Sequence, residues 1–293
     1  MNTAQAPAMQ EKKKKSQWGE VWRRLKANKM AMAGLIILIL LILMALGADI
    51  IAPEGYDAQE ISNRFQPPSA ENWFGTDNLG RSLFSRVVHG SRTSLSVGIV
   101  SVGIAIIIGG LLGAAAGFYG GKIDNVIMRL MDILLAIPSI LLAISIVAAL
   151  GGGLFNVMLA VGISSIPGYA RIVRASVIQI KGQEFVEAAR AIGADDKRII
   201  LMHIIPNALA PIIVQGTLGV AGAILSAAGL SFIGLGLAPP SPEWGAMLSA
   251  GRDYIRDHMW MTLWPGLFIM ITILSLNLLG DGLRDALDPK LKD

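Results

Sequence analysis

The 293-residue chain contains no cysteine and only three histidines, which excludes several kinds of site at the outset. Disulfide bonds and thiolate metal sites both require cysteine. The histidines, His89, His203 and His258, lie too far apart in the sequence to suggest a pair of metal ligands. We therefore expect no disulfide, no metal and no cofactor in this chain.

Charge is also scarce, since only 16% of the residues are charged whereas 53% are hydrophobic. Long stretches contain no Asp, Glu, Lys or Arg at all, which is typical of an integral membrane protein rather than of a soluble domain. The net charge of +4 does not indicate a nucleic-acid partner, because the basic residues lie beside the apolar runs, where they orient a chain in the membrane. The expected surroundings are membrane lipid, and no nucleic acid is expected.

Several uncharged runs are long enough to cross a bilayer, which takes about 20 apolar residues in a helix. The run 133–170 is too long for one crossing, and the glycines at 151–153 offer the turn that divides it. These runs predict an all-α integral membrane protein with six transmembrane helices. The six are expected at 30–48, 93–121, the two halves of 133–170, 207–235 and 259–280.

The distribution of basic residues predicts the orientation of these helices, because cytoplasmic segments carry an excess of Lys and Arg. With the N-terminus in the cytoplasm, nineteen basic residues fall inside and six outside. The inside set is Lys12, Lys13, Lys14, Lys15, Arg23, Arg24, Lys26, Lys29, Lys122, Arg129, Arg171, Arg174, Lys181, Arg190, Lys197, Arg198, Arg284, Lys290 and Lys292. The outside set is Arg64, Arg81, Arg86, Arg92, Arg252 and Arg256.

This orientation divides the chain into regions with both termini in the cytoplasm. The regions are a basic cytoplasmic tail (1–29), a first transmembrane helix (30–51), an external segment (52–92), a five-helix core (93–282) with a cytoplasmic loop (181–206), and a cytoplasmic C-terminal tail (283–293). A second external segment is expected at 236–258.

The basic tail carries Trp18, Trp22 and Leu25 at helical spacing, with basic residues between them. This pattern predicts a short amphipathic helix lying along the inner membrane surface. The alternative is a disordered segment that continues to the first span. Residues 1–15 are expected to be disordered in either case.

Small residues form two ladders within the predicted spans, at positions where helix backbones can approach closely. Glycines in a helix also permit bending, and Pro138 and Pro167 are expected to leave carbonyl groups unpaired inside the third and fourth spans. Close packing is the simpler interpretation of each glycine, and hinge bending is the alternative. The ladders are Gly109, Gly113 and Gly117, and Gly219, Ala223 and Ala227.

No charged residue lies in the middle of a predicted span. Asp132 lies near the cytoplasmic start of the third span, spaced i,i+3 from Arg129 as in a surface ion pair. Ion-driven carriers usually have a buried charge, although backbone carbonyls can also bind sodium. Ser164 and Ser165 lie in a span, but no His or Asp accompanies them. The pattern therefore disfavours both a secondary transporter and a membrane enzyme.

A polar stretch, "EFVEAARAIGADDKRIILMHIIPNA" (184–208), separates the fourth and fifth spans. Its spacing predicts two short helices joined at a bend, with Gly193 as a left-handed C-terminal cap and Asp195 or Asp196 as the cap of a second helix that continues to Pro206. The first helix has an apolar face of Phe185, Ala188, Ala189 and Ile192 and a polar side of Glu184, Glu187 and Arg190. The orientation places this stretch in the cytoplasm, where its apolar face can pack on the chain's own helix ends or on another protein; the pattern leaves both open.

The segment Glu187-Ala188-Ala189, followed by three residues and Gly193, and then Pro206, resembles the EAA loop of ABC-importer permeases. The general signature has Ile-x-Leu-Pro where this chain has His203-Ile204-Ile205-Pro206. The His-x-x-Pro-Asn pattern resembles the version found in dipeptide, oligopeptide and nickel importers.

Three further segments resemble the same branch, so that the resemblance covers most of residues 70–290. The segment 74–98 resembles its external signature, although Ser82 stands where Asp is usual, which leaves any specific role of that position in doubt. The other two segments, 234–254 and 276–290, resemble its last external loop and its C-terminal end, with Leu276 where Phe is common.

The resemblance implies the C-type permease subunit of an ATP-driven importer, with a type I (MetI-like) core, in a bacterial cell membrane. Small peptides are the expected solute, and nickel chelates or glutathione are the alternatives. The implied partners are a second homologous permease, two cytosolic ABC ATPases and an external solute-binding protein. The chain has no P-loop sequence, so ATP and Mg are expected on the ATPases. The implied ATPase contacts are Glu184, Phe185, Glu187, Ala188, Ala189, Arg190, Gly193 and Ala194.

Overall fold

The structure, a computed structural model, describes residues 17–288. The predictions for residues 1–15, Lys290 and Lys292 lie outside this range. The α-helices are α1 (Gln17–Ala27), α2 (Lys29–Leu46), α3 (Ala48–Ile51), α4 (Leu83–Tyr119), α5 (Gly121–Leu135), α6 (Ser139–Leu150), α7 (Leu154–Lys181), α8 (Glu184–Ala191), α9 (Asp196–Arg198), α10 (Ile205–Phe232), α11 (Trp244–Gly251) and α12 (Trp260–Leu287). Short 3₁₀ turns cover Ile61–Asn63 and Arg252–Tyr254, and a π-helical turn covers Ile199–Ile204.

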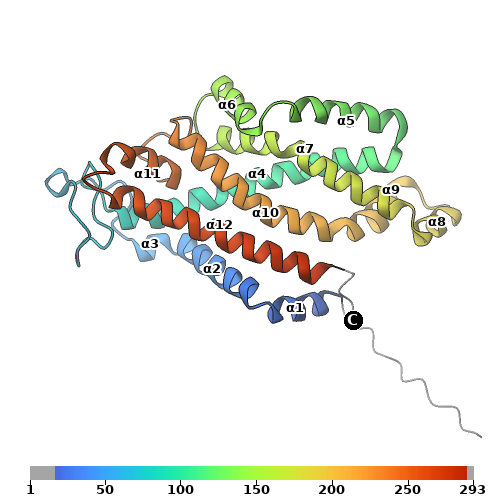
Figure 1. The fold of residues 1–293 in the computed structure, drawn as a ribbon, viewed down its shortest axis with the longest axis horizontal. Coiled ribbons are helices and arrows are strands. Elements are labelled where there is room, and N and C mark those ends of the chain that lie inside the picture. The colour runs from blue at the N-terminus through green and yellow to red at the C-terminus, as the bar shows by residue number, and fades with distance from the viewer. Residues whose placement is uncertain (1–16, 289–293) are drawn as a thin grey trace, which may run out of the picture.

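The helices form an elongated bundle whose long members run side by side (Figure 1). Five helical segments are long and apolar enough to cross a membrane: Lys29–Leu46, Leu83–Tyr119, Leu154–Lys181, Asp196–Phe232 and Trp260–Leu287. The bent pair α5 and α6 makes a sixth if it is counted as one span. Within residues 17–288 there is no β-strand, only an isolated bridge between Thr76 and Ser82. The predicted all-helical membrane fold is confirmed.

The third predicted span is broken at Pro138, a residue expected inside a helix. α5 starts at Gly121 and ends at Leu135, and α6 leaves it at an angle of 86°. Pro138 lies at the break in an extended conformation (φ −50°, ψ 130°) instead of inside a helix. Proline lacks the backbone N–H that a continuous helix needs, and it disfavours the helical conformation in the preceding residue, so the chain bends here.

Two helices are longer than the uncharged runs that predicted them. α4 begins at Leu83, ten residues before the predicted start at 93, and α12 continues to Leu287, beyond the predicted end at 280. The charged residues that end these runs mark where a helix leaves the hydrocarbon, but they do not interrupt its hydrogen bonds. Hydropathy therefore located these two spans but predicted helices that were too short.

The glycine ladder on α4 lies against α7 with almost no space between the backbones. A Cβ added at Gly109 would lie 2.7 Å from the carbonyl oxygen of Ile166, and one added at Gly117 would lie 2.9 Å from that of Arg174. Helices that associate in lipid gain mainly from such close van der Waals packing. Close packing, rather than bending, accounts for this ladder.

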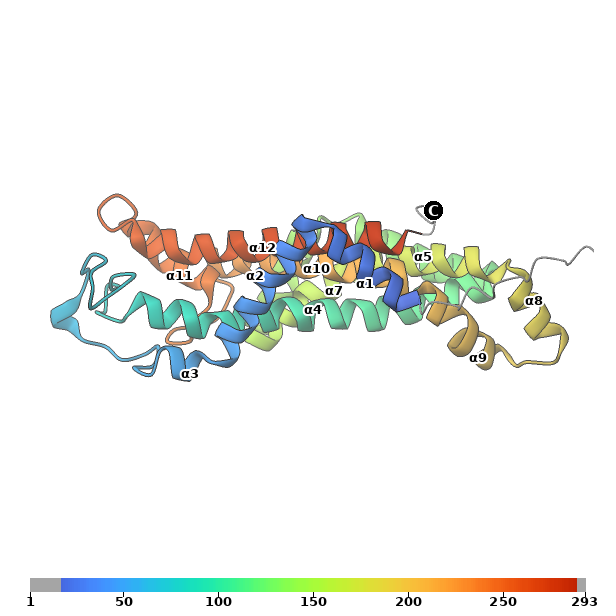
Figure 2. The ribbon, with the colours of Figure 1, turned by 90° about the horizontal axis from the view of Figure 1, so that it is seen from below.

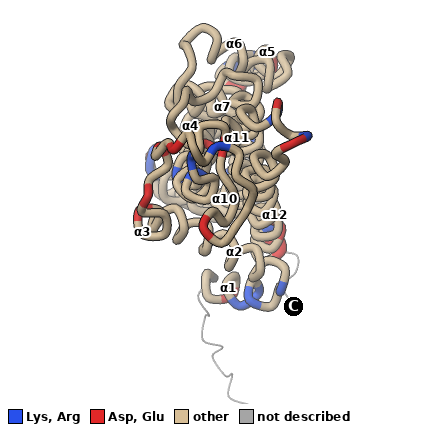
Figure 3. The backbone as a smooth tube through the Cα atoms, turned by 90° about the vertical axis from the view of Figure 1, so that its left-hand side faces the viewer, with Lys and Arg blue, Asp and Glu red and all other residues tan. Residues whose placement is uncertain are grey.

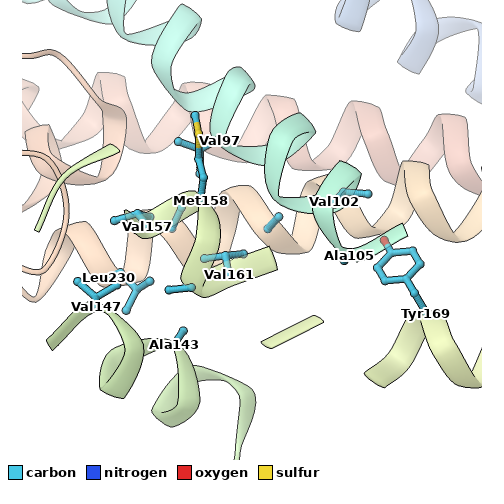
Figure 4. Close-up of a cluster of buried hydrophobic side chains, with 13 residues drawn as sticks. Val97, Val102, Ala105, Ala143, Val147, Val157, Met158, Val161, Tyr169 and Leu230 are labelled. Carbon is cyan, nitrogen blue, oxygen red and sulfur yellow. The ribbon is translucent and has the colours of Figure 1, made fainter. Parts of the chain in front are cut away.

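The largest apolar cluster joins α4, α6, α7 and α10 (Figure 4). Tyr169 lies at its edge and donates a hydrogen bond to the carbonyl of Gln215 (3.2 Å). Its hydroxyl occupies the space that a side chain at Gly219 would need. Ala223 and Ala227, the other members of the second ladder, are buried in the same cluster. Both predicted ladders are therefore packing surfaces.

Two ion pairs join α5 to α7. Asp124 accepts from the Arg174 Nε and Nη2 atoms at 2.5 and 2.6 Å. Asp132 accepts from Arg171 at 2.6 Å, so the predicted pair of Asp132 with Arg129 was wrong. Arg129 is spaced i,i+3 from Asp132 on the same helix, but the Asp132 carboxylate pairs with Arg171 on α7. Spacing within one helix does not reveal which residues of a neighbouring helix lie close to it.

The ends of the bundle differ in what they carry. α8 and α9 lie at one end of the bundle, and α11 and the loop of residues 52–82 lie at the other (Figures 1 and 2). α1 and the end of α12 lie between these ends, in the half of the bundle that carries α8 and α9. The predicted inside and outside segments thus lie toward opposite ends of the molecule.

A turn at residues 75–82 starts α4. The Asp77 carboxylate is buried and accepts from the Arg81 Nε atom (2.7 Å) and from the Leu79 and Arg81 amides (2.9 and 3.0 Å). Ser82 is the N-cap of α4 and accepts from the Ser85 amide (3.3 Å). Asp and Ser are about equally good N-caps, so the serine that departs from the family pattern can still fulfil the capping role of an aspartate here.

Buried polar contacts hold α11 against the same end of the bundle. Glu243 caps α11 and accepts from the Gly245 and Ala246 amides at 2.8 Å each. Trp244 is fully buried and donates from Nε1 to the carbonyl of Val87 (3.0 Å). Burial raises the pKa of the Glu243 carboxyl, because removal from water disfavours its charged form.

Candidate functional site

The polar stretch between α7 and α10 projects from one end of the bundle as a compact unit (Figure 2). α7 ends at Lys181, and α8 begins three residues later, after Gln183 in an extended conformation. The two short helices predicted on either side of Gly193 are both present.

One side of α8 packs on the chain itself. Val186 is only 1% exposed, and Ala189 is also buried. Val186 belongs to a cluster that includes Phe118 at the end of α4, Val177 on α7, and Ile199 on the π-helical turn. Because three separate elements support α8 from behind, its position relative to the spans is fixed.

The other apolar side of α8 is uncovered. Phe185 and Ala188 are exposed, and Ile192, the residue that follows the helix, is 86% exposed. We refer to Phe185, Ala188 and Ile192 as the open stripe. The predicted apolar face is therefore divided: Ala189 is buried by the chain itself, whereas the open stripe is exposed, although the Phe185 ring also lies near the His203 ring (6.5 Å between centroids).

Val186 was missed in the sequence-based choice of site residues. Val186, Ala189 and Gly193 also follow a spacing of i, i+3 and i+7, so two apolar stripes overlap in this helix. Spacing identifies both stripes but does not reveal which one packs inward. The inward stripe is the one that meets Ile199 and Ile204 of the following turn.

The charged residues of α8 divide in the same way. Arg190 lies with its guanidinium carbon 5.9 Å from the centre of the Phe118 ring, and Lys181 also lies over that ring at 5.5 Å. Cation–π contacts of this kind orient the two side chains toward the end of α4. Glu184 and Glu187 are exposed and remain the carboxylates that face outward.

Gly193 ends α8 in a Schellman motif. The Ala194 amide donates to the Ala189 carbonyl (3.1 Å), and the Gly193 amide donates to the Arg190 carbonyl (3.0 Å). Gly193 has φ +87°, in the left-handed region, and no atom lies within 4 Å of an added Cβ. The glycine is therefore required by backbone conformation and not by lack of space. Ala194 is half-buried and packs against the same cluster as Val186.

The second helix does not end at Pro206, contrary to the prediction. Asp195 caps its start by accepting from the Arg198 amide (3.2 Å), and a π-helical turn then leads directly into α10. The Ile205 amide bonds to the Ile200 carbonyl, and Pro206 falls in the first turn of α10. Proline is tolerated at this position because the backbone N–H groups in the first turn of a helix have no partner within the helix. The π-helical turn before it also changes the hydrogen-bond register of the backbone.

An open depression of about 490 Å³ lies beside the start of α8, lined by Gln179, Gly182, Gln183, Glu184 and Phe185. It adjoins the open stripe, so the uncovered surface is concave on one side. Among residues 17–288 no cluster of three or more His, Asp or Glu side chains is placed to hold a metal ion. The site therefore consists of a firmly backed helix with an uncovered apolar stripe, which is suited to binding another protein.

Residues 90–293 match the family described as "Binding-protein-dependent transport system inner membrane component". Residues 16–68 match a second family, described as "N-terminal TM domain of oligopeptide transport permease C". The two matches leave only residues 69–89 between them, a segment that contains the first seven residues of α4.

Curated relatives match over nearly the whole chain. The dipeptide transport system permease protein DppC of Alkalihalophilus pseudofirmus is 52% identical over 277 residues, which cover 94% of this chain and 91% of the relative. The glutathione transport system permease protein GsiD of Escherichia coli O157:H7 is 48% identical over 278 residues, with coverage of 94% and 91%.

Among solved structures, a chain of the MetNI methionine ABC transporter in an inward-facing conformation has a similar fold. The TM-score is 0.57 at 20% sequence identity, and the match covers 69% of this chain and 97% of the other. At this identity the likeness concerns the fold alone, and it supports the predicted type I importer core.

Proposed function

The chain belongs to the family of binding-protein-dependent transport system inner membrane components, and we propose that it is a permease subunit of an ATP-driven importer of dipeptides and other small peptides. The relative that is 52% identical across almost the full length of both chains is named as a dipeptide permease. The match to the N-terminal domain of oligopeptide permease C supports the same solute class.

Glutathione, itself a tripeptide, is the second candidate solute. The relative named as a glutathione permease is 48% identical with the same coverage. Uptake assays with dipeptides, tripeptides and glutathione in a strain that lacks this subunit distinguish these solutes. Uptake of a dipeptide that depends on the subunit supports the proposal, whereas dependence of glutathione uptake alone contradicts it.

The partners of this subunit follow from its role in an importer. We propose a second homologous permease, two cytosolic ABC ATPases that bind ATP and Mg, and an external binding protein that delivers the solute. The proposed location is a bacterial cytoplasmic membrane, since the family description refers to an inner membrane component and the relatives are bacterial. In this arrangement the chain forms part of the solute path and does not hydrolyse ATP.

The observation that carries the proposal is the open stripe on a fixed helix. A docked helix transmits motion between proteins only if its position in its own chain is fixed. Val186 anchors α8 to the ends of the spans and Ala189 is also buried, while Phe185, Ala188 and Ile192 remain exposed and can fill an apolar cleft. We propose that the ATPase holds this stripe, so that closure of the ATPases on ATP moves α8 and the spans together.

The orientation of the bundle is tested by single cysteines, which report cleanly because the natural chain has none. We propose that Ala70 faces the outside and Ile192 the cytoplasm. An impermeant thiol reagent applied to intact cells should label Ala70→Cys and not Ile192→Cys. Labelling of Ile192→Cys alone would reverse the proposed topology.

The docking role is tested by placing a charge on the open stripe. Ala188→Asp and Ile192→Asp should each reduce both ATPase co-purification and peptide uptake, because burial of an unpaired carboxylate in an apolar cleft is costly. Ala191→Asp is the matched control, since Ala191 is also exposed on α8 but lies among the polar residues. All three substitutions affect exposed side chains, so thermal stability should stay unchanged. Equal effects of Ala188→Asp and Ala191→Asp would argue against docking through the stripe.

A further inference from the structure

α1 presents two different faces. Val21 and Leu25 pack against α12 and the start of α2, in a cluster with Ala31, Leu279 and Ala286. Arg24 strengthens this contact by donating to the carbonyl of Asp288 (3.4 Å) and to Glu20 (3.1 Å). α1 is therefore fixed to the bundle by one side.

The opposite side of α1 is exposed. Trp18 and Trp22, one turn apart, are 60% and 45% exposed. Lys26 continues this row and places its ammonium group 5.1 Å from the centre of the Trp22 ring. Large indole rings rarely face bulk water in a row with lysine, whereas this combination is typical of the boundary between water and lipid headgroups.

The position of α1 relative to the first span determines what it meets. Asn28 caps α2 by accepting from the Met30 and Ala31 amides (3.1 Å each), so only one residue separates α1 from that span. The outward side of α2 carries a row of exposed apolar residues, Ile36, Leu40 and Leu43. Figure 3 shows α1 at the edge of the bundle opposite α5 and α6, with basic residues along it. The exposed row of α1 thus lies at the end of a surface made for lipid.

We propose that α1 is a binding site for anionic phospholipid of the inner leaflet. The Trp18 and Trp22 rings lie at the level of the headgroups, and Arg23, Lys26 and Lys29 bind the phosphates. All three cations are exposed. The carboxylate on the same helix, Glu20, is shared between Arg24 (3.1 Å) and Arg23 (3.8 Å), and Lys26 and Lys29 form no ion pair in the described part of the chain. After these ion pairs are counted, α1 and Lys29 keep a net positive charge that can bind phosphate.

The site has a consequence for the transporter as a whole. α1 joins the cytoplasmic ends of α2 and α12, so bound lipid fixes these two helices relative to the membrane plane. This inference is independent of the solute, since it depends only on the position of α1 at the membrane surface.

The test is lipid retention by the full transporter, with this chain co-expressed with its partner subunits. The complex is placed in nanodiscs of phosphatidylcholine with a minor fraction of phosphatidylglycerol, then extracted, and the lipids that remain bound are counted by mass spectrometry. Each basic residue near an anionic surface contributes a factor of roughly five in binding. The triple variant Arg23→Gln, Lys26→Gln, Lys29→Gln should therefore retain at least about tenfold less phosphatidylglycerol than the unmodified complex.

A second triple variant, Arg64→Gln, Arg252→Gln, Arg256→Gln, is the matched control, since it removes the same charge from exposed residues at the other end of the bundle. It should retain phosphatidylglycerol normally. Equal losses in both triples, or equal retention of the two lipids by the unmodified complex, would overturn the proposal. So would cross-linking of Trp22→Cys to a partner subunit, because that result would assign the exposed row to a protein contact.

Discussion

Substitution of Gly109 by alanine should push α4 away from α7. An added Cβ would lie 2.7 Å from the Ile166 carbonyl oxygen, 3.0 Å from the Tyr169 Cβ atom and 3.1 Å from the Ala170 amide nitrogen. Such atoms normally stay more than about 3.4 Å apart, and two of the three neighbours are rigid backbone, so the helices must separate by several tenths of an ångström. Overpacking of this kind costs about 1–3 kcal/mol. For a chain of this size the melting temperature should fall by roughly 2–10 °C.

Gly110 provides a control one residue away. No atom lies within 4 Å of a Cβ added there, and alanine favours the helix over glycine by up to about 1 kcal/mol. The assay is thermal unfolding of the detergent-solubilised chain, with Gly109→Ala and Gly110→Ala measured side by side. Gly110→Ala should be neutral or stabilising. If both variants melt at the wild-type temperature, the reasoning that close backbone approach requires Gly109 is refuted.

Three further substitutions test separate contacts. Gly193→Val should disrupt the Schellman motif, because a β-branched residue is strained at φ +87°. It should reduce ATPase co-purification and peptide uptake without lowering the melting temperature of the spans. Gly193→Asn should have a milder effect, and normal co-purification and uptake in the valine variant would contradict this prediction. Ser82→Ala should lose about 0.5–2 kcal/mol of stability with the N-cap of α4, whereas Ser82→Asp should retain it; equal melting temperatures would show that the cap is unimportant. Because burial raises the pKa of Glu243, the folded state keeps a proton on this carboxyl that the unfolded chain releases. As the pH rises above about 4.3, the melting temperature of the natural protein should therefore fall relative to that of Glu243→Gln. Parallel pH profiles of the two proteins would refute this.

Hydropathy and charge were sufficient to predict the helical class and the approximate places of the spans, because a bilayer constrains length and composition strongly. They did not predict the 86° bend between α5 and α6, since residues 133–150 contain no charged residue and hydropathy does not register the conformation of a single proline. Nor did they predict the pairing of Asp132 with Arg171, which depends on how two helices lie in space.

The candidate site was predicted in part. Helical spacing, the cap at Gly193 and the cap at Asp195 are local features, and the structure contains each of them. Which side of α8 faces inward depends on Ile199 and on the ends of α4 and α7, and no local pattern contains that information. For this reason spacing leaves the side of Ala189 open, and the resemblance counts it among the ATPase contacts although it is buried in this chain.

The central claim is that a partner ATPase covers the open stripe of α8. Ile192→Cys, introduced into the cysteine-free chain, provides the most direct measurement, because this residue is 86% exposed in the chain alone. The rate of labelling by a small water-soluble thiol reagent is compared between the isolated chain and the complete complex, with Ala191→Cys on the polar side of the same helix as the reference. We expect fast labelling of Ile192→Cys in the isolated chain and strong protection in the complex, with Ala191→Cys much less affected. Equally fast labelling of Ile192→Cys in the chain and in an active complex would contradict the account.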